Sequence, residues 1–138
     1  MQYQSITSVL LVEQIEPSLF FWVGRLGFTK VAEVHEGDAL GFVILAKDGV
    51  QIMYQTYDSV KKDTPAILDH MDMAASRSAV YIKISDIDWI EKHLDGVDII
   101  FPKRKAFYGA TEISVREPAG HIITFAAFLD TQAEESNY

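Results

Sequence analysis

The chain has 138 residues, the size of one ordinary domain, and its 49% hydrophobic content is typical of a folded protein. It contains no cysteine, which excludes disulfides, iron–sulfur clusters and cysteine nucleophiles. Acidic residues outnumber basic ones by 20 to 12, and the net charge of −8 disfavours nucleic-acid binding. No apolar run reaches the ~20 residues of a membrane span, and the N-terminus lacks the features of a signal peptide. We therefore expect a cytoplasmic protein with neither a nucleic-acid nor a membrane partner.

The first half of the chain predicts the element order β-α-β-β-β. Residues 6–12 are rich in Val, Leu and Ile, as in a buried strand. A helix is expected from about Pro17, and its apolar stripe falls at helical spacing. That stripe comprises Leu19, Phe20, Val23 and Leu26. Three more strands are predicted over residues 28–35, 40–46 and 50–56, separated by glycine-containing turns.

The second half of the chain repeats this order after a connector. Residues 57–78 lack strand alternation and are interpreted as the connector, with room for a short helix over 65–73. A strand is predicted over 79–84, and a helix from Asp86 or Asp88. Three further strands are predicted over 97–101, 112–116 and 121–129, the first of them ending before Pro102.

The spacing of equivalent positions supports an internal repeat. Val12 and Ile84 are offset by 72 residues, and Val50 and His121 by 71. Such a repeat indicates duplication, and four strands in each half are too few to bury both faces of a sheet. We therefore expect one domain over 1–138, with modules at about 5–56 and 79–129 joined by the connector.

Two segments carry a resemblance to a known family. The first is Val9-Leu10-Leu11-Val12 followed by residues 17–22 and by Leu26-Gly27-Phe28. The second is residues 107–121, in which a Tyr-Gly pair precedes an Arg-Glu-Pro-Ala-Gly turn. With the repeat, they cover residues 5–129. The chain thus resembles the vicinal-oxygen-chelate superfamily, which contains glyoxalases, extradiol dioxygenases and bleomycin-resistance proteins.

The resemblance implies an α+β fold in which two βαβββ modules form an open, barrel-like cleft. In the enzymes of the superfamily the cleft holds a divalent metal, bound by His, Gln or Glu on the first and fourth strands of the modules. The matching positions here are Thr7 or Ser8, Met53, Ser78 or Ala79, and Thr124. None is His, Glu or Asp, so we expect neither a metal nor another cofactor.

Strand alternation indicates which side chains line the implied cleft. Residues of the same parity as Met53 and Thr124 are expected to face it, and the aromatic residues near them are expected to form its walls. Methionine, uncharged polar groups and rings suit a flat organic ligand. The predicted ligand-binding residues are Met53, Gln51, Gln55, Thr124, Ala126, Tyr108, Phe107, His35 and Phe42.

Two charged features lie beside these residues. Glu112 and Arg116 are interpreted as an ion pair. The role of Lys103-Arg104-Lys105 stays open, because the net negative charge favours a neutral or cationic ligand whereas this cluster favours an anion at one rim.

Three functions are compatible with the sequence. The first, which we expect, is a metal-free binding protein similar to the bleomycin-resistance branch, which sequesters a partly aromatic, neutral or cationic compound and so gives antibiotic resistance. The second is a glyoxalase-like lyase or dioxygenase-like enzyme with an atypical site. The third is a non-catalytic homodimer with another ligand or none. A homodimer is expected in any case, because open sheets leave edge strands unprotected.

Overall fold

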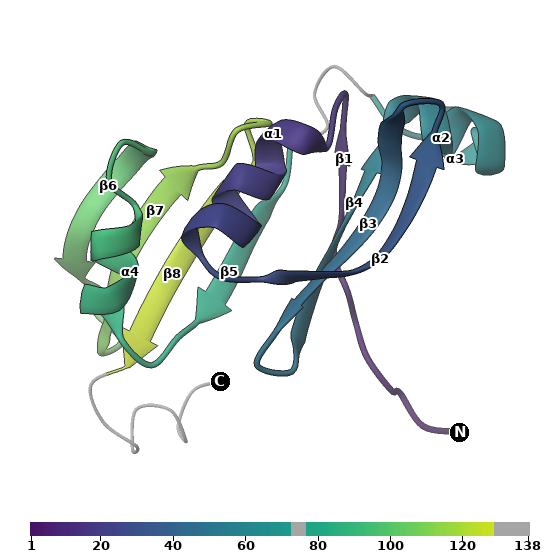
Figure 1. Cartoon of the computed structure of the whole chain (residues 1–138). Coiled ribbons are helices and arrows are strands. Elements are labelled where there is room, and N and C mark those ends of the chain that lie inside the picture. The colour runs from purple at the N-terminus through teal and green to yellow at the C-terminus, as the bar shows by residue number, and fades with distance from the viewer. Residues whose placement is uncertain (73–76, 129–138) are drawn as a thin grey trace. The chain divides into compact units, whose positions relative to one another are not determined.

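The computed structural model describes residues 1–72 and 77–128, and the chain divides into two compact units, Met1–Ser78 and Ala79–Tyr138 (Figure 1). Each unit contains one four-stranded sheet, with the order β1-β4-β3-β2 in the first unit and β5-β8-β7-β6 in the second. The same strand order in both sheets agrees with the repeat in the sequence, and the α+β fold class is confirmed.

The first sheet combines one parallel and two antiparallel pairs. Strand β1 (Val9–Val12) runs parallel to β4 (Val50–Thr56), and β3 (Ala39–Lys47) is antiparallel to both β4 and β2 (Thr29–Glu36). Strand β1 is shorter than the strand predicted over 6–12 because its parallel pairing begins only at Val9, opposite Met53.

The helix of the first unit begins as predicted and then changes its geometry. Helix α1 (Glu16–Leu19) continues directly as a π-helical segment, η1 (Phe20–Arg25), in which Leu26 N donates to Phe21 O at 3.2 Å. The predicted apolar stripe is wrong in part: Leu26 is buried as predicted, but Phe20 is 76% exposed, whereas Phe21 and Trp22 are buried. The helix turns the face of Ile15, Ser18 and Trp22 to the core instead.

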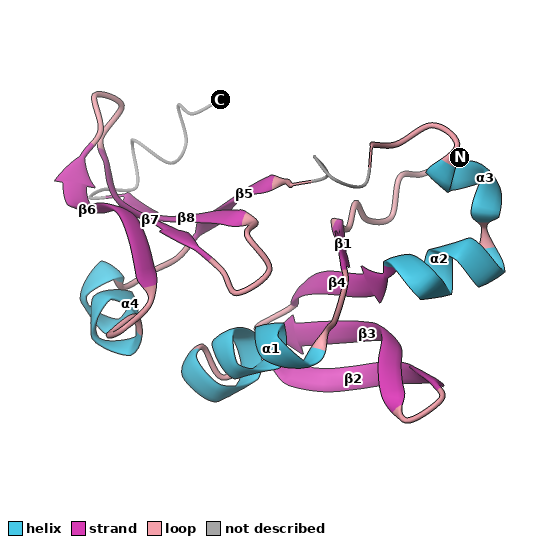
Figure 2. Cartoon of the chain, turned by 90° about the horizontal axis from the view of Figure 1, so that it is seen from above, coloured by secondary structure: helices cyan, strands magenta, loops and turns pink. Residues whose placement is uncertain are grey.

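A buried hydrogen bond places this helix on one face of the first sheet. Trp22 Nε1 donates to Tyr54 Oη at 2.7 Å, and both side chains are fully buried. Because side chains alternate along a strand, Ile52 and Tyr54 face the helix while Met53 faces the other way. Figure 2 shows α1 beside this sheet.

The connector contains two short helices. Helix α2 (Tyr57–Asp63) has Thr56 as its N-cap, and Thr56 Oγ1 accepts a hydrogen bond from Ser59 N at 3.1 Å. Helix α3 (Pro65–Leu68) follows. The sequence predicted only the second of these helices; Thr56, a capping residue, was the signal that could have found the first. Residues 73–76 lie outside the described part.

The second sheet has the same plan. Strand β5 (Ala79–Lys83) is parallel to β8 (Ile122–Phe128), and β7 (Ala110–Arg116) is antiparallel to β8 and to β6 (Asp98–Lys105). Strand β6 continues through Pro102, contrary to the prediction, because an edge strand tolerates a missing backbone N–H. The last strand was predicted to reach 129, a residue outside the described part.

Helix α4 (Ile87–His93) packs on β7 and β8 of this sheet. Asp86 is its N-cap, and Asp86 Oδ1 accepts from Trp89 N at 3.1 Å. The helix presents Ile90 to the sheet, and Leu94 follows at its end; both are buried. One face of the second sheet is thereby covered by α4.

Candidate functional site

The two faces of the second sheet have different chemistry. Ile113 pairs with Phe125 on the side of α4, and both are apolar and buried. On the other side Glu112 pairs with Ala126, and Ser114 pairs with Thr124. We call this side the Glu112 face; its members are Tyr81, Lys83, Arg104, Glu112, Ser114, Thr124 and Ala126, by cross-strand pairing.

The Glu112 carboxylate is the centre of this face. Its residue is only 2% exposed, yet it bonds to two tyrosines that reach the surface. Tyr81 Oη donates to Glu112 Oε2 at 2.7 Å, and Tyr108 Oη donates to the same oxygen. Tyr81 and Tyr108 are 46% and 38% exposed. A buried carboxylate thus lies directly below two accessible phenol rings.

The second oxygen of Glu112 has a weaker partner. Arg104 Nη2 lies 3.6 Å from Glu112 Oε1, which is ion-pair distance but beyond hydrogen-bond length. The Arg104 side chain is 57% exposed, and its guanidinium stacks over the Phe101 ring at 3.9 Å. The two carboxylate oxygens are therefore unequal: Oε2 is held by two hydrogen bonds and Oε1 by one loose charge contact.

The surroundings of Tyr81 fix its protonation. Burial of its hydroxyl, the hydrogen bond with Tyr108 and the Glu112 carboxylate together raise the pKa of Tyr81 above 10.0, its ordinary value. A phenolate beside a carboxylate would place two negative charges together. Tyr81 therefore stays protonated at neutral pH and acts as a donor to Glu112.

The rest of the Glu112 face combines rings and hydroxyl groups with a second cation, Lys83. Ser114 Oγ and Thr124 Oγ1 lie 3.0 Å apart and share a hydrogen bond. Lys83 Nζ lies 4.7 Å from the centre of the Phe128 ring, and that ring is 6.2 Å from the Tyr108 ring. The exposed part of this face therefore consists largely of the Tyr81 and Tyr108 rings, while Glu112 and Ser114 are buried.

The structure groups four predicted residues on the first sheet. Gln51, Met53 and Gln55 alternate with residues that face α1, and Phe42 pairs with Gln55. These four side chains therefore share the face of the first sheet opposite α1. His35 lies near the end of β2 instead, with a side chain 57% exposed and Nε2 at 3.8 Å from Glu33 Oε1.

The second sheet groups three of the other predicted residues. Thr124 and Ala126 lie on the Glu112 face, and Tyr108 bonds to its central carboxylate. Phe107 is 99% exposed, with its ring edge-on to that of Tyr108 at 4.9 Å. The sequence thus named Tyr108, Thr124 and Ala126 as site residues, but neither Glu112 nor Tyr81.

The predicted ion pair between Glu112 and Arg116 is wrong. Arg116 Nε donates to Asp98 Oδ2 at 3.2 Å, while Glu112 bonds to the tyrosines. Parity was the signal that could have found Glu112: counted back across the turn, it falls opposite Ala126, a residue already assigned to the site.

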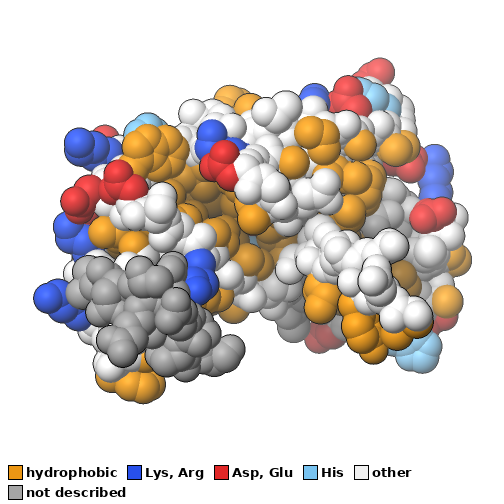
Figure 3. Space-filling model, turned by 90° about the horizontal axis from the view of Figure 1, so that it is seen from below, with side chains coloured by type: hydrophobic (Ala, Val, Ile, Leu, Met, Phe, Trp, Pro, Cys, Tyr) orange, Lys and Arg blue, Asp and Glu red, His pale blue; other side chains and the backbone are white. Residues whose placement is uncertain are grey.

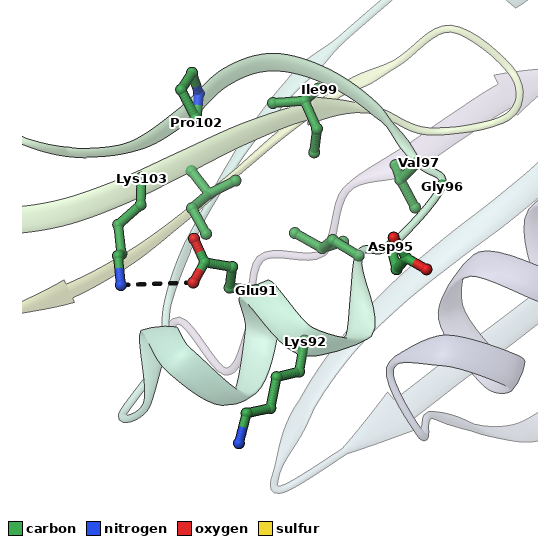
Figure 4. A pocket seen from close by; sticks show the side chains of 10 residues that line it. Glu91, Lys92, Asp95, Gly96, Val97, Ile99, Pro102 and Lys103 are labelled. Carbon is green, nitrogen blue, oxygen red and sulfur yellow. Dashed lines mark ion pairs between the residues drawn. The ribbon is translucent and has the colours of Figure 1, made fainter.

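The basic cluster at 103–105 is divided between the two faces of the sheet. Lys103 Nζ pairs with Asp88 at 3.0 Å and with Glu91 at 3.5 Å, both on α4, whereas Arg104 turns to Glu112. Figure 4 shows Lys103 and Glu91 at the rim of a hollow of about 400 Å³ between α4 and β6. This hollow contains none of the predicted ligand-binding residues, and the cluster forms no single basic rim.

The residues present do not fit the metal that the resemblance implies. Ser8, Met53, Ala79 and Thr124 offer a hydroxyl, a thioether, a methyl group and a hydroxyl at the matching positions. Within residues 1–72 and 77–128, no three His, Cys, Asp or Glu side chains are grouped so that they could hold a metal ion. A divalent cation of the expected kind requires carboxylate or imidazole donors.

Large apolar side chains are exposed on the edge strands of both sheets. Val31 and Val34 on β2 are each 54% exposed, and Ile99 and Ile100 on β6 are 42% and 41% exposed. Apolar surface is also visible among the side chains of Figure 3.

In the part of the chain that the structure describes, no helix is long and apolar enough to cross a membrane.

Comparison with known proteins identifies the fold. No family model matches the sequence, and no curated protein matches it. Among solved structures, a glyoxalase/bleomycin resistance protein/dioxygenase from Nocardioides is 20% identical, with a TM-score of 0.72 over 95% of this chain and 87% of its own. TioX from Micromonospora sp. ML1 is 18% identical, with a TM-score of 0.71 over 92% and 100%.

A third solved structure holds a ligand. The bleomycin-binding protein of Streptomyces verticillus, complexed with copper(II)-bleomycin, is 20% identical, with a TM-score of 0.61 over 92% of this chain and 98% of its own. All three likenesses extend over nearly the whole chain. The chain therefore has the fold of the glyoxalase/bleomycin-resistance/dioxygenase proteins, as its resemblance to the vicinal-oxygen-chelate superfamily implies.

Proposed function

We propose that this chain is a small-molecule-binding protein that holds a partly aromatic, neutral or cationic compound on the Glu112 face without a metal ion. The observation that carries the proposal is the Glu112 carboxylate, buried below two accessible tyrosine rings. A carboxylate in this environment attracts a positive group more strongly than one in open water, because less solvent screens it.

The remaining chemistry of the face suits the same ligand class. The rings of Tyr81, Tyr108 and Phe128 offer surfaces for stacking, and Ser114 and Thr124 offer hydroxyls. Aromatic surface with a few placed polar groups is the usual composition of a small-molecule site. The net charge of −8 favours the approach of a cation and opposes that of an anion.

Within the described residues, 1–72 and 77–128, no group of metal ligands is present, and this favours binding over the metal-dependent catalysis of the superfamily. Sequestration needs affinity only, and it lowers the free concentration of a toxic compound without any reaction. The bleomycin-binding protein among the similar structures supports such a use of the fold. Resistance to an antibiotic by sequestration is the biological role that we propose.

The active form that we propose is a homodimer. Strands β2 and β6 are sheet edges, and both carry exposed valine or isoleucine side chains. Unpaired edges with apolar side chains are stabilised when a second copy covers them.

Calorimetric titration tests the ligand class. Three probes of similar size are compared at low and moderate salt: a cationic glycopeptide of the bleomycin type, a neutral aromatic amide and an aromatic carboxylate. We expect the first two to bind, and Glu112→Gln to weaken the cationic probe about tenfold or more, because a charged partner is lost. The matched control is Glu91→Gln, which removes an equal charge from α4. Tight binding of the carboxylate alone, weakened by salt, would reject the proposal.

A further inference from the structure

We propose that Arg104 is an internal competitor for the ligand: in the free protein its guanidinium occupies the place beside Glu112 Oε1 that the positive group of the ligand takes. This inference rests on the proposed function. The inference concerns Arg104 and not the two tyrosines that bond to the carboxylate. It adds that Arg104 blocks the cation-binding position in the free protein.

The contact geometry is that of an exchangeable partner. A structural arginine normally holds a carboxylate through two parallel hydrogen bonds of about 2.7–2.9 Å. Here one nitrogen lies 3.6 Å from one oxygen, and no hydrogen bond forms. The Arg104 side chain is 57% exposed while that of Glu112 is 3% exposed, so the cation can return to water and the anion cannot. Displacing such an exposed partner is inexpensive.

Arg104 also has a second interaction partner, the ring of Phe101. Its guanidinium lies over the Phe101 ring at 3.9 Å, and this stack does not depend on Glu112. The β6 register shifts between Phe101 and Arg104, which lets two residues of one strand stack their side chains. A ligand that takes Oε1 therefore leaves the arginine supported by the ring.

The other oxygen restricts exchange to this one position. Oε2 accepts from both Tyr81 and Tyr108, so two donors would have to leave before a ligand could take it. A ligand cation at Oε1 keeps both bonds and lies beside the tyrosine rings. The favoured class is an amidinium or primary ammonium attached close to an aromatic ring, since such a group satisfies the carboxylate and the rings together.

Benzamidine is the probe that tests the competitor. Its binding is measured by calorimetry on the wild-type chain and on Arg104→Gln, Arg116→Gln and Glu112→Gln. We expect Arg104→Gln to bind benzamidine about twofold to fivefold more tightly than the wild type, the range that matches loss of an exposed ion pair. Glu112→Gln should bind it at least about tenfold more weakly.

Arg116→Gln is the matched control, because Arg116 lies on β7 of the same sheet and forms an exposed ion pair with Asp98. It removes the same charge without touching Glu112, so its affinity should equal that of the wild type. Equal tightening in both arginine variants would reduce the effect to overall charge and overturn the inference.

Other outcomes separate the inference from the proposed function. Unchanged or weaker binding in Arg104→Gln, with weaker binding also in Glu112→Gln, overturns the competitor and leaves the cation site intact. Absence of binding to the wild type and to Arg104→Gln overturns both. The two arginine variants change only exposed residues, so their comparison does not depend on whether the buried Glu112→Gln variant folds. Thermal unfolding checks that each variant is folded.

Discussion

Tyr81 on β5 donates a hydrogen bond of 2.7 Å to Glu112 on β7, although β8 lies between these two strands. On β8, Tyr81 pairs with Thr124, whereas Glu112 pairs with Ala126. The phenol of Tyr81 therefore reaches diagonally across the middle strand. An edge strand supplies in this way a donor to the central carboxylate.

The alkaline stability of the chain should depend on Tyr81. Because its pKa is raised in the folded state, its proton contributes stability that is fully present below 10.0 and is lost as the pH rises above that value, where the unfolded chain releases the proton first. Tyr81→Phe should remove this part of the pH dependence and lower the neutral-pH stability by about 1 kcal/mol through the lost hydrogen bond.

Denaturant unfolding of the wild type and of Tyr81→Phe, on either side of pH 10, measures this effect. Tyr3→Phe is the control, since Tyr3 is 91% exposed. The same alkaline loss in the wild type and in Tyr81→Phe would contradict the assignment.

Acid stability should depend on Glu16. Glu16 Oε2 accepts from Leu40 N at 2.8 Å, and this hydrogen bond holds the pKa of Glu16 below 4.5. The charged carboxylate therefore contributes stability that is present above pH 4.5 and is lost as the pH falls through the lower folded pKa. Glu16→Gln should flatten the stability curve in this window. Unfolding curves at acidic pH measure it, with exposed Glu13→Gln as the control; an unchanged slope would speak against the bond.

Purified protein should carry no stoichiometric metal. Ser8, Met53, Ala79 and Thr124 supply neither imidazole nor carboxylate, and such donors are what a divalent ion needs. Elemental analysis after purification without chelator should find well under one divalent ion per chain. One equivalent of zinc, nickel, iron or manganese would contradict the inference that these four positions do not hold a divalent ion.

The chain should be a dimer in solution. Unpaired edge strands with exposed apolar residues, such as Val31 and Val34, are the surfaces that a second copy would cover. Sedimentation velocity across micromolar concentrations should give twice the mass of the chain. If β2 forms part of the dimer interface, replacing both valines by lysine should shift the equilibrium to the monomer. A wild-type chain that is a monomer at every concentration would contradict the prediction.

Much of the fold followed from the sequence alone. Apolar patterning and turn residues located each strand within the described residues, and β4 has the limits predicted for it, 50–56. The sequence indicated Asp86 or Asp88 as the start of a helix, and Asp86 is the N-cap of α4. These signals are local: a strand, a turn or a cap depends on residues within a few positions of one another, so a single sequence contains the information.

The candidate site was decided by tertiary structure. Glu112 lies 31 residues from Tyr81, and nothing in the spacing of the two indicates that they bond. Arg104 turns to Glu112 while Lys103 turns to α4, because β6 alternates its side chains between two faces whose charges are supplied by other elements. In the helix, Phe20 is exposed and Trp22 is buried against Tyr54, a choice made by packing on the sheet. Periodicity predicts which residues share a face, but a partner across strands is chosen only when the strands are brought together.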